Sequence, residues 1–150
     1  MDDKTCFAPS KRDPREFVFV DYQQISENEY LTGMLNAMPD LAAILNENRQ
    51  IVFANKTLVD FLKVLDQSEI IGCRPGEAIN CVNSKINAGG CGTSENCRYC
   101  GAVNAIVDSQ NAEEKVVRDC RITTTADDGK EFLDLEVTAT PFNYKLKKLV

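Results

Sequence analysis

The chain has 150 residues, of which 43% are hydrophobic and 27% charged, the composition of one soluble globular domain. Its formal net charge is −6 and basic residues cluster only near the C-terminus, so we expect no nucleic-acid binding, which needs clustered Lys and Arg. No apolar run is long enough for a membrane span and the N-terminus has no apolar signal core. We therefore expect a cytoplasmic domain without membrane contact.

The sequence contains seven cysteines and no histidine. Without imidazole, haem ligation by histidine and a catalytic triad built on that ring are both excluded. An odd number of cysteines, in a chain with an evident core and no secretion signal, argues against a complete disulfide framework. Metal binding or redox chemistry is favoured instead. Because no nucleophile–base pair or phosphate-binding loop is visible, we do not expect an enzyme.

The first third of the chain predicts a leader and a helix. Residues 1–24 are polar, contain two prolines and are expected to form a flexible N-terminal leader, with a short extended piece at 17–20. A helix is predicted from Ser26, which would be its N-cap, because an acidic residue follows three positions later as in a capping box. Apolar residues then recur at helical spacing, and Pro39 ends the helix.

A hairpin and further helices are predicted next. Two short apolar segments, 41–45 and 51–54, flank a polar turn and indicate antiparallel strands. Asn55 is predicted to cap the following helix, and a short helical stretch begins near Asp66. Beyond the cysteine-rich region, residues 102–110 predict another helix.

The last third is rich in β-forming residues. Segments 115–125 and 132–140 predict strands, joined by a turn at 127–130, and 147–150 begins a further β-prone segment. The order of elements predicts an α+β fold, with helices packed on one face of an antiparallel sheet.

Three short motifs occur in an order typical of one family. Pro39-Asp40 precedes the first strand, Ala54-Asn55 joins the second strand to a helix, and residues 70–72 form a turn that ends in glycine. In this order they resemble a PAS domain, and the resemblance covers most of the chain. We therefore expect residues 25–150 to be a PAS-like sensor domain, with a cysteine-rich insert at about 73–101.

The resemblance implies a role in signal transduction. PAS domains bind a small cofactor or ligand between sheet and helices, often form a homodimer through an N-terminal helix, and signal to an attached output module. It therefore implies dimerisation through the N-terminal helix and an output module such as a histidine kinase outside this chain. Met34 and Met38 then fit a core or dimer seam.

Four cysteines form the candidate metal site, in the pattern C-x9-C-x5-C-x2-C: Cys81, Cys91, Cys97 and Cys100. Four thiolates on a glycine-rich loop make a sulfur site suited to zinc or to an iron–sulfur cluster. Zinc ligands usually come as two tight pairs, whereas here only the last two cysteines are close in sequence. The spacing favours an iron–sulfur cluster. Structural zinc is the alternative, and free thiols or air-formed disulfides are the third possibility.

The remaining cysteines are weaker candidates. Cys73 is a possible fifth ligand, Cys120 is predicted to be a small buried residue in a strand, and Cys6 lies in the leader without a predicted role. The step Asn80-Cys81 matches light-sensing flavin-binding PAS domains, but the residues after it do not continue their pattern. The pair formed by Cys97 and Cys100 also lacks the preceding strand of a thioredoxin-like motif.

Two functions follow as expectations. The first is a PAS input domain whose iron–sulfur cluster serves redox or oxygen sensing. The second is a zinc-stapled interaction or dimerisation module that senses a small ligand in its cleft.

Overall fold

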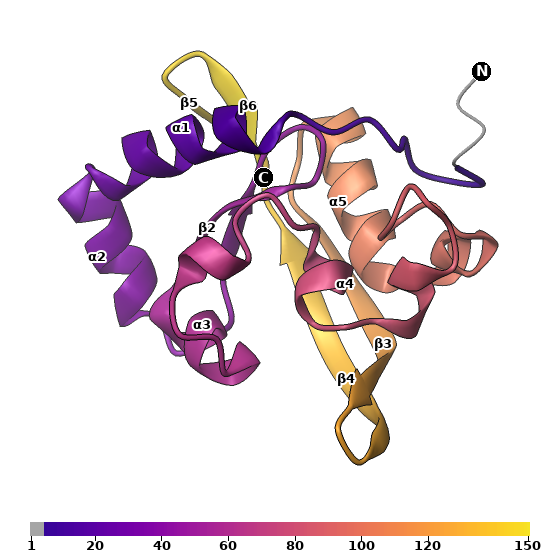
Figure 1. The fold of residues 1–150 in the computed structure, drawn as a ribbon. Helices are drawn as coiled ribbons and strands as arrows, with labels where there is room; N and C mark the ends of the chain where they lie inside the picture. Colours follow the sequence, from indigo (N-terminus) through magenta and orange to yellow (C-terminus); the bar gives the residue numbers. More distant parts are fainter. Residues whose placement is uncertain (1–4) are drawn as a thin grey trace. The chain divides into compact units, whose positions relative to one another are not determined.

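The computed structural model describes residues 5–150 (Figure 1). The chain forms two compact units. One, which we call the cysteine-rich unit, comprises Met1–Lys11 and Arg74–Val150, and the other, the helix–hairpin unit, comprises Arg12–Cys73. The division of the chain into a leader at 1–24 and a sensor domain at 25–150 remains a prediction.

The helix–hairpin unit begins with helix α1, Arg15–Ser26. Val18, Asp21 and Ile25 are buried at spacings of three and four, so one face of the helix is covered. The extended piece predicted at 17–20 is therefore wrong, since these residues lie inside α1. A short run of apolar residues does not by itself distinguish a strand from a buried segment of helix.

Helix α2, Glu29–Ala37, follows α1 after a short turn. Its N-cap is Asn28, whose side-chain oxygen accepts a hydrogen bond from the Leu31 N–H at 3.1 Å. The prediction of Ser26 as the cap is therefore wrong, because Ser26 is the last residue of α1. The helix ends before Pro39 as predicted, because a residue preceding proline is pushed out of the helical region.

The predicted hairpin is confirmed. Strands β1, Ala43–Leu45, and β2, Ile51–Ala54, pair antiparallel, and every residue of β2 is buried. The Asn46 side-chain oxygen accepts hydrogen bonds from the N–H groups of Asn48 and Gln50, which closes the turn.

Asn55 caps helix α3, Lys56–Leu62, as predicted, and accepts a hydrogen bond from the Leu58 N–H at 3.0 Å. Asn55 is fully buried and donates to the carbonyl oxygens of Leu35 and Asp40. One side chain thus joins the end of α2, the start of the hairpin and α3. A short helix, Gln67–Glu69, follows where a helical stretch was predicted.

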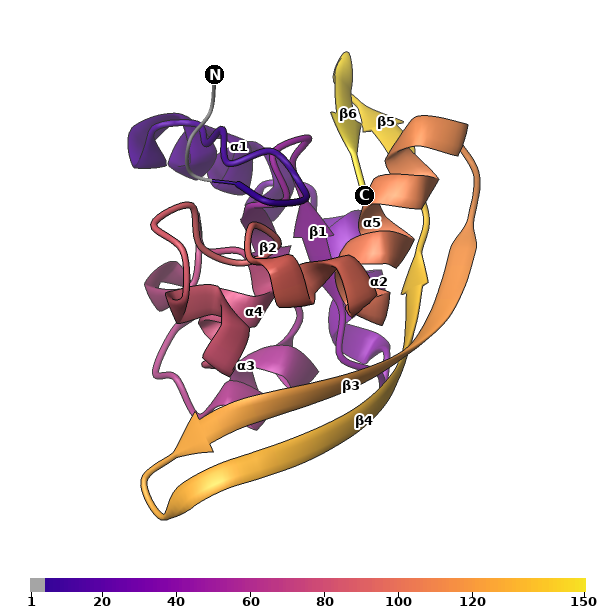
Figure 2. The same ribbon diagram turned by 90° about the vertical axis from the view of Figure 1, so that its right-hand side faces the viewer.

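The cysteine-rich unit contains the remaining elements (Figure 2). Its helical segments are α4 (Pro75–Ala78), η2 (Val82–Lys85), η3 (Glu95–Tyr99) and α5 (Gly101–Ala112). Its strands are β3 (Val116–Ala126), β4 (Gly129–Ala139), β5 (Phe142–Tyr144) and β6 (Lys147–Leu149). The predicted helix at 102–110 and the predicted long hairpin are both confirmed.

Helix α5 lies beside the β3–β4 hairpin (Figure 2). It buries Val103, Ala105 and Ile106, while Cys120 and Ile122 are buried on β3. A Cβ on Gly101 would collide with the carbonyl oxygen of Asp119, so only glycine allows the start of α5 to approach the strand this closely.

The strands of the described residues form three antiparallel pairs, β1–β2, β3–β4 and β5–β6. Together with the helices they confirm the predicted α+β class. Within residues 5–150, no helix has the length and apolar character needed to cross a membrane.

Candidate thiol site

The four predicted ligands lie on successive segments of the cysteine-rich unit. Cys81 follows α4 and forms a β-bridge with Thr124 of β3, while Cys91 lies in the loop before η3. Cys97 is inside η3, and Cys100 is the N-cap of α5. All four predicted ligands therefore come from the segment that joins α4 to α5.

Gly76 brings Cys81 and Cys91 side by side. A Cβ at this glycine would lie 2.6 Å from the Cys91 Sγ and 3.4 Å from the Cys81 Cβ. The Cys81 N–H also donates to the Gly76 carbonyl oxygen at 2.7 Å. The space that a side chain would fill at position 76 is thus occupied by a thiol.

The surroundings of Cys81 and Cys91 disfavour their thiolates. Desolvation raises the pKa of Cys91 to about 12, and repulsion from Cys97 and Cys100 adds to the effect. The pKa of Cys81 is also raised, mainly by desolvation, with repulsion from the same two residues. Gly76 places Cys81 next to Cys91, and Cys91 and Cys100 pack against the core that contains Cys97, so the four predicted residues lie in one region.

Cys97 is fixed in a small core. It is buried together with Ala8 and Val103, and Cys91 and Cys100 pack against this cluster. Its Sγ lies 3.2 Å from the Ser94 Oγ, a hydrogen-bonding distance for sulfur. Segment 5–8 of the expected leader takes part, since the N–H groups of Cys6 and Ala8 donate to carbonyl oxygens of the loop.

Cys120 is buried as predicted, but it also touches the candidate site. Its Sγ lies 3.8 Å from the Cys100 Sγ. The hydrogen bond from the Cys120 thiol favours the thiolate of Cys100 and lowers the pKa of Cys100 to about 6, while the pKa of Cys120 is raised. The contact joins residues twenty positions apart, and local spacing in the sequence gives no sign of it.

Arg74 and Glu77 are functional candidates that the sequence analysis did not identify. The Arg74 guanidinium is fully buried and donates to the carbonyl oxygens of Gly89 and Cys91 at 3.0 and 3.3 Å. The Glu77 carboxylate accepts from the N–H groups of Arg74 and Cys91 at 2.9 and 3.1 Å. These two side chains hold the loop that carries Cys91. The only sequence signal was the turn-forming Pro75 between them.

Cys73 and Cys6 are the weaker candidates of the sequence analysis. Cys73 belongs to the helix–hairpin unit, where its carbonyl oxygen accepts a hydrogen bond from the Ile51 N–H at 2.7 Å. Cys6 is exposed, and its Sγ lies 3.7 Å from the Asn87 Nδ2.

Among residues 5–150, no group of three or more Cys, Asp or Glu side chains is arranged so that it could hold one metal ion. The thiols gather in one region without converging on a single point. Around a cluster the ligand sulfurs stand farther apart than around one ion, because irons and sulfides lie between them. The donor type, four thiols, fits such a group, and ligation itself remains a prediction.

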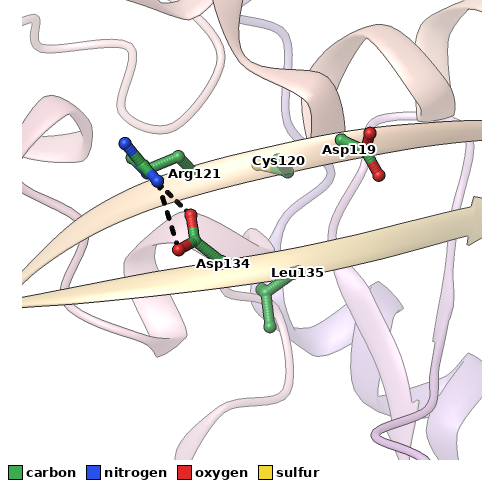
Figure 3. A pocket seen from close by; sticks show the side chains of 5 residues that line it. All are labelled: Asp119, Cys120, Arg121, Asp134 and Leu135. Carbon is green, nitrogen blue, oxygen red and sulfur yellow. Dashed lines mark hydrogen bonds and ion pairs between the residues drawn. The ribbon is translucent and has the colours of Figure 1, made fainter.

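A surface depression of about 580 Å³ lies on the β3–β4 hairpin (Figure 3), lined by Asp119, Cys120, Arg121, Asp134 and Leu135. The Arg121 Nε lies 2.7 Å from the Asp134 Oδ1, and this ion pair is largely exposed. Asp119 and Arg121 alternate with Cys120 along β3, so their side chains point to the opposite face from its buried thiol. None of the four predicted ligands lines the depression.

Comparison with known proteins shows the fold. No protein-family model and no curated protein matches the chain. It is similar to the PAS domain of a two-component sensor histidine kinase, with a TM-score of 0.51 and 9% identity over 85% of this chain and 93% of the other. It is also similar to the PAS domain of an HTR-like protein from Haloarcula marismortui, with a TM-score of 0.49 and 17% identity over 83% and 91%. The chain therefore has the fold of a PAS domain, as its motifs predicted.

Proposed function

We propose that this chain is the sensory input domain of a signal-transduction protein, and that its cysteine-rich region binds an iron–sulfur cluster for redox or oxygen sensing. The observation that carries the proposal is the gathering of Cys81, Cys91, Cys97 and Cys100 in one region of a PAS fold. Such a cluster would supply a one-electron redox centre. The zinc-stapled module is the alternative, but a single zinc ion needs donors that converge on one point.

Residues around the thiols support this assignment. Gly76 leaves the space that the Cys91 Sγ occupies, and the Ser94 Oγ is placed to hydrogen-bond the Cys97 Sγ. The buried guanidinium of Arg74 places a positive charge next to the Cys91 peptide, where it offsets the negative charge of gathered thiolates. The four proposed ligands are free thiols, which suits the reducing cytoplasm that we propose as the location.

The proposed signal begins at Cys100, because this residue is both a proposed ligand and the N-cap of α5. When Cys100 is released from the metal, the start of α5 loses its link to the cysteine loop and is free to shift against β3. We propose that the N-terminal helices of a homodimer transmit this change to an output module, such as a histidine kinase, outside this chain. Tyr30 and Met34 on α2 are 88% and 72% exposed, as side chains of a dimer seam would be in a single chain. The chain itself is proposed to have no enzymatic activity.

The assignment of the metal site is tested by replacing Cys97 and Cys100, the two proposed ligands that are closest in sequence. In Cys97→Ser/Cys100→Ser protein, purified without oxygen, we expect metal and sulfide content to fall to background while circular dichroism stays that of the wild type. Cys6→Ser is the matched control, because Cys6 is exposed and outside the predicted set. Full metal content in the double variant would contradict the assignment.

A further inference from the structure

Cys100 and Cys120 are neighbours in space although they belong to different elements. Cys100 begins α5, Cys120 lies in the middle of β3, and their Sγ atoms are 3.8 Å apart. Cys120 is not among the predicted metal ligands. The pair therefore needs an explanation that the proposed cluster does not provide.

We propose that Cys100 and Cys120 are a redox-active dithiol that closes to a disulfide when Cys100 is not bound to metal. This inference goes beyond the proposed function, since thiol–disulfide chemistry needs no metal. Both activities use Cys100, whose sulfur cannot bind the metal and form a disulfide at the same time. Disulfide formation would hold the domain in a metal-free state until a thiol reductant reopens the bond.

The geometry around the pair favours closure. The sulfurs of a disulfide are about 2 Å apart, so roughly 2 Å of approach is shared between two side chains. The backbones are already close, because a Cβ on Gly101 would lie 3.1 Å from the Cys120 Cα. The strand and the helix start need little rearrangement for the bond to form.

Cys97 is the other candidate for the disulfide partner of Cys100, because it lies only three residues before Cys100. Its Sγ lies against the Ser94 Oγ, at 3.2 Å, inside the small core with Ala8 and Val103. Cys120 is the thiol that contacts Cys100, and it is the partner that we assign.

The chemistry requires a hydroperoxide, which is the class of oxidant that we propose. The half-buried Cys100 sulfur attacks the peroxide O–O bond and becomes a sulfenic acid, while an alcohol, or water from hydrogen peroxide, leaves. The Cys120 sulfur then attacks the Cys100 sulfur, the S–S bond forms, and the sulfenic oxygen leaves as water. Two thiols lose two electrons and two hydrogens in total, and one hydroperoxide is reduced.

Peptide mapping of the whole chain tests the pair directly. The protein, purified without oxygen, is treated with hydrogen peroxide, alkylated and digested with trypsin, with iron measured in the same sample. Trypsin cleaves after Lys and Arg, so Cys100 falls in peptide 99–115, Cys120 in 119–121, and Cys97 in 86–98 together with Cys91. We expect peptide 99–115 linked to 119–121 as the main oxidised species, lighter by two hydrogens and reversed by dithiothreitol.

Other results would overturn the inference. A link from 99–115 to 86–98 would make Cys97 the partner, and irreversible oxidation of Cys100 without a link would show that no thiol resolves it. In Cys120→Ser and Cys120→Ala we expect the link to disappear and iron content to stay as in the wild type. Loss of iron in both folded variants would instead make Cys120 a ligand. The linked peptide is detected whether or not the protein holds iron. An iron-free protein that forms the link would therefore contradict the proposed cluster but not the Cys100–Cys120 disulfide.

Discussion

The guanidinium of Arg74, which is fully buried, donates a hydrogen bond to the carbonyl oxygen of Cys91 at 3.3 Å. The same side chain donates to the carbonyl oxygens of Gly89, Pro9 and Lys11 at 3.0, 3.2 and 2.7 Å. A buried charge is costly unless its donors are satisfied, so these carbonyls make the position possible. Arg74 thereby joins the N-terminal segment to the loop that carries the candidate ligand.

Replacing Arg74 by methionine should destabilise the cysteine-rich unit. Carbonyl oxygens that Arg74 satisfies would be left buried without this donor, and we expect a loss of about 3 kcal/mol in the free energy of unfolding. Urea unfolding measures the change. Arg98→Met is the matched control, because Arg98 is half exposed and pairs with Glu95 at the surface, so its loss should cost less than about 1 kcal/mol. Equal effects in the two variants would contradict a structural role for Arg74.

Replacing Gly76 by alanine should impair the thiol site more than the fold. The added Cβ would lie 2.6 Å from the Cys91 Sγ, so the thiol must move away. We expect metal binding to weaken by about 10-fold or more, as for other residues that orient ligands. Metal titration of the apoprotein measures this. Gly33→Ala has open space around its Cβ and should leave binding unchanged. Wild-type affinity in Gly76→Ala would show that Cys91 is not a ligand.

Replacing Gly101 by alanine should weaken the packing of α5 on β3. The new methyl group would collide with the Asp119 carbonyl oxygen, and backbone has little freedom to give way. We expect a loss of about 3 kcal/mol, at the upper end of overpacking effects. Chemical denaturation provides the test, again with Gly33→Ala as control, since that change in a helix should be neutral or slightly stabilising. A stable variant would mean that α5 and β3 are not in close contact.

The metal-free protein should show unequal cysteine reactivity. The thiolate is the reactive form, and the Cys120 hydrogen bond lowers the pKa of Cys100 to about 6, whereas desolvation raises that of Cys91 to about 12. At neutral pH Cys100 should therefore react with iodoacetamide well before Cys91, and its labelling should slow as the pH falls below about 6. Cys120→Ala removes the hydrogen bond and should slow labelling of Cys100 at neutral pH. Faster labelling of Cys91 than of Cys100 would contradict this electrostatic arrangement.

Local patterns in the sequence predicted much of the fold. The hairpin, the Asn55 cap and the helix now seen as α5 follow from periodicity and capping, which depend on neighbouring residues. The start of α2 was misplaced because Ser26 and Asn28 are both good caps, and only the structure shows that Asn28 binds the Leu31 N–H.

The candidate site was only partly predictable for a related reason. Cysteine spacing pointed to four residues that the structure gathers in one region, but no spacing indicates that Cys120 touches Cys100 across α5 and β3. Arg74 was missed because a buried arginine is uncommon, and its carbonyl partners are distant in the chain.

The central claim is that the gathered cysteines hold an iron–sulfur cluster, and anaerobic purification followed by an absorption spectrum with iron, zinc and sulfide analysis tests it most directly. We predict brown protein with visible charge-transfer bands and matching amounts of iron and sulfide. Colourless protein with stoichiometric zinc and no sulfide would contradict the claim and leave the zinc-stapled module as the function of the cysteine-rich region.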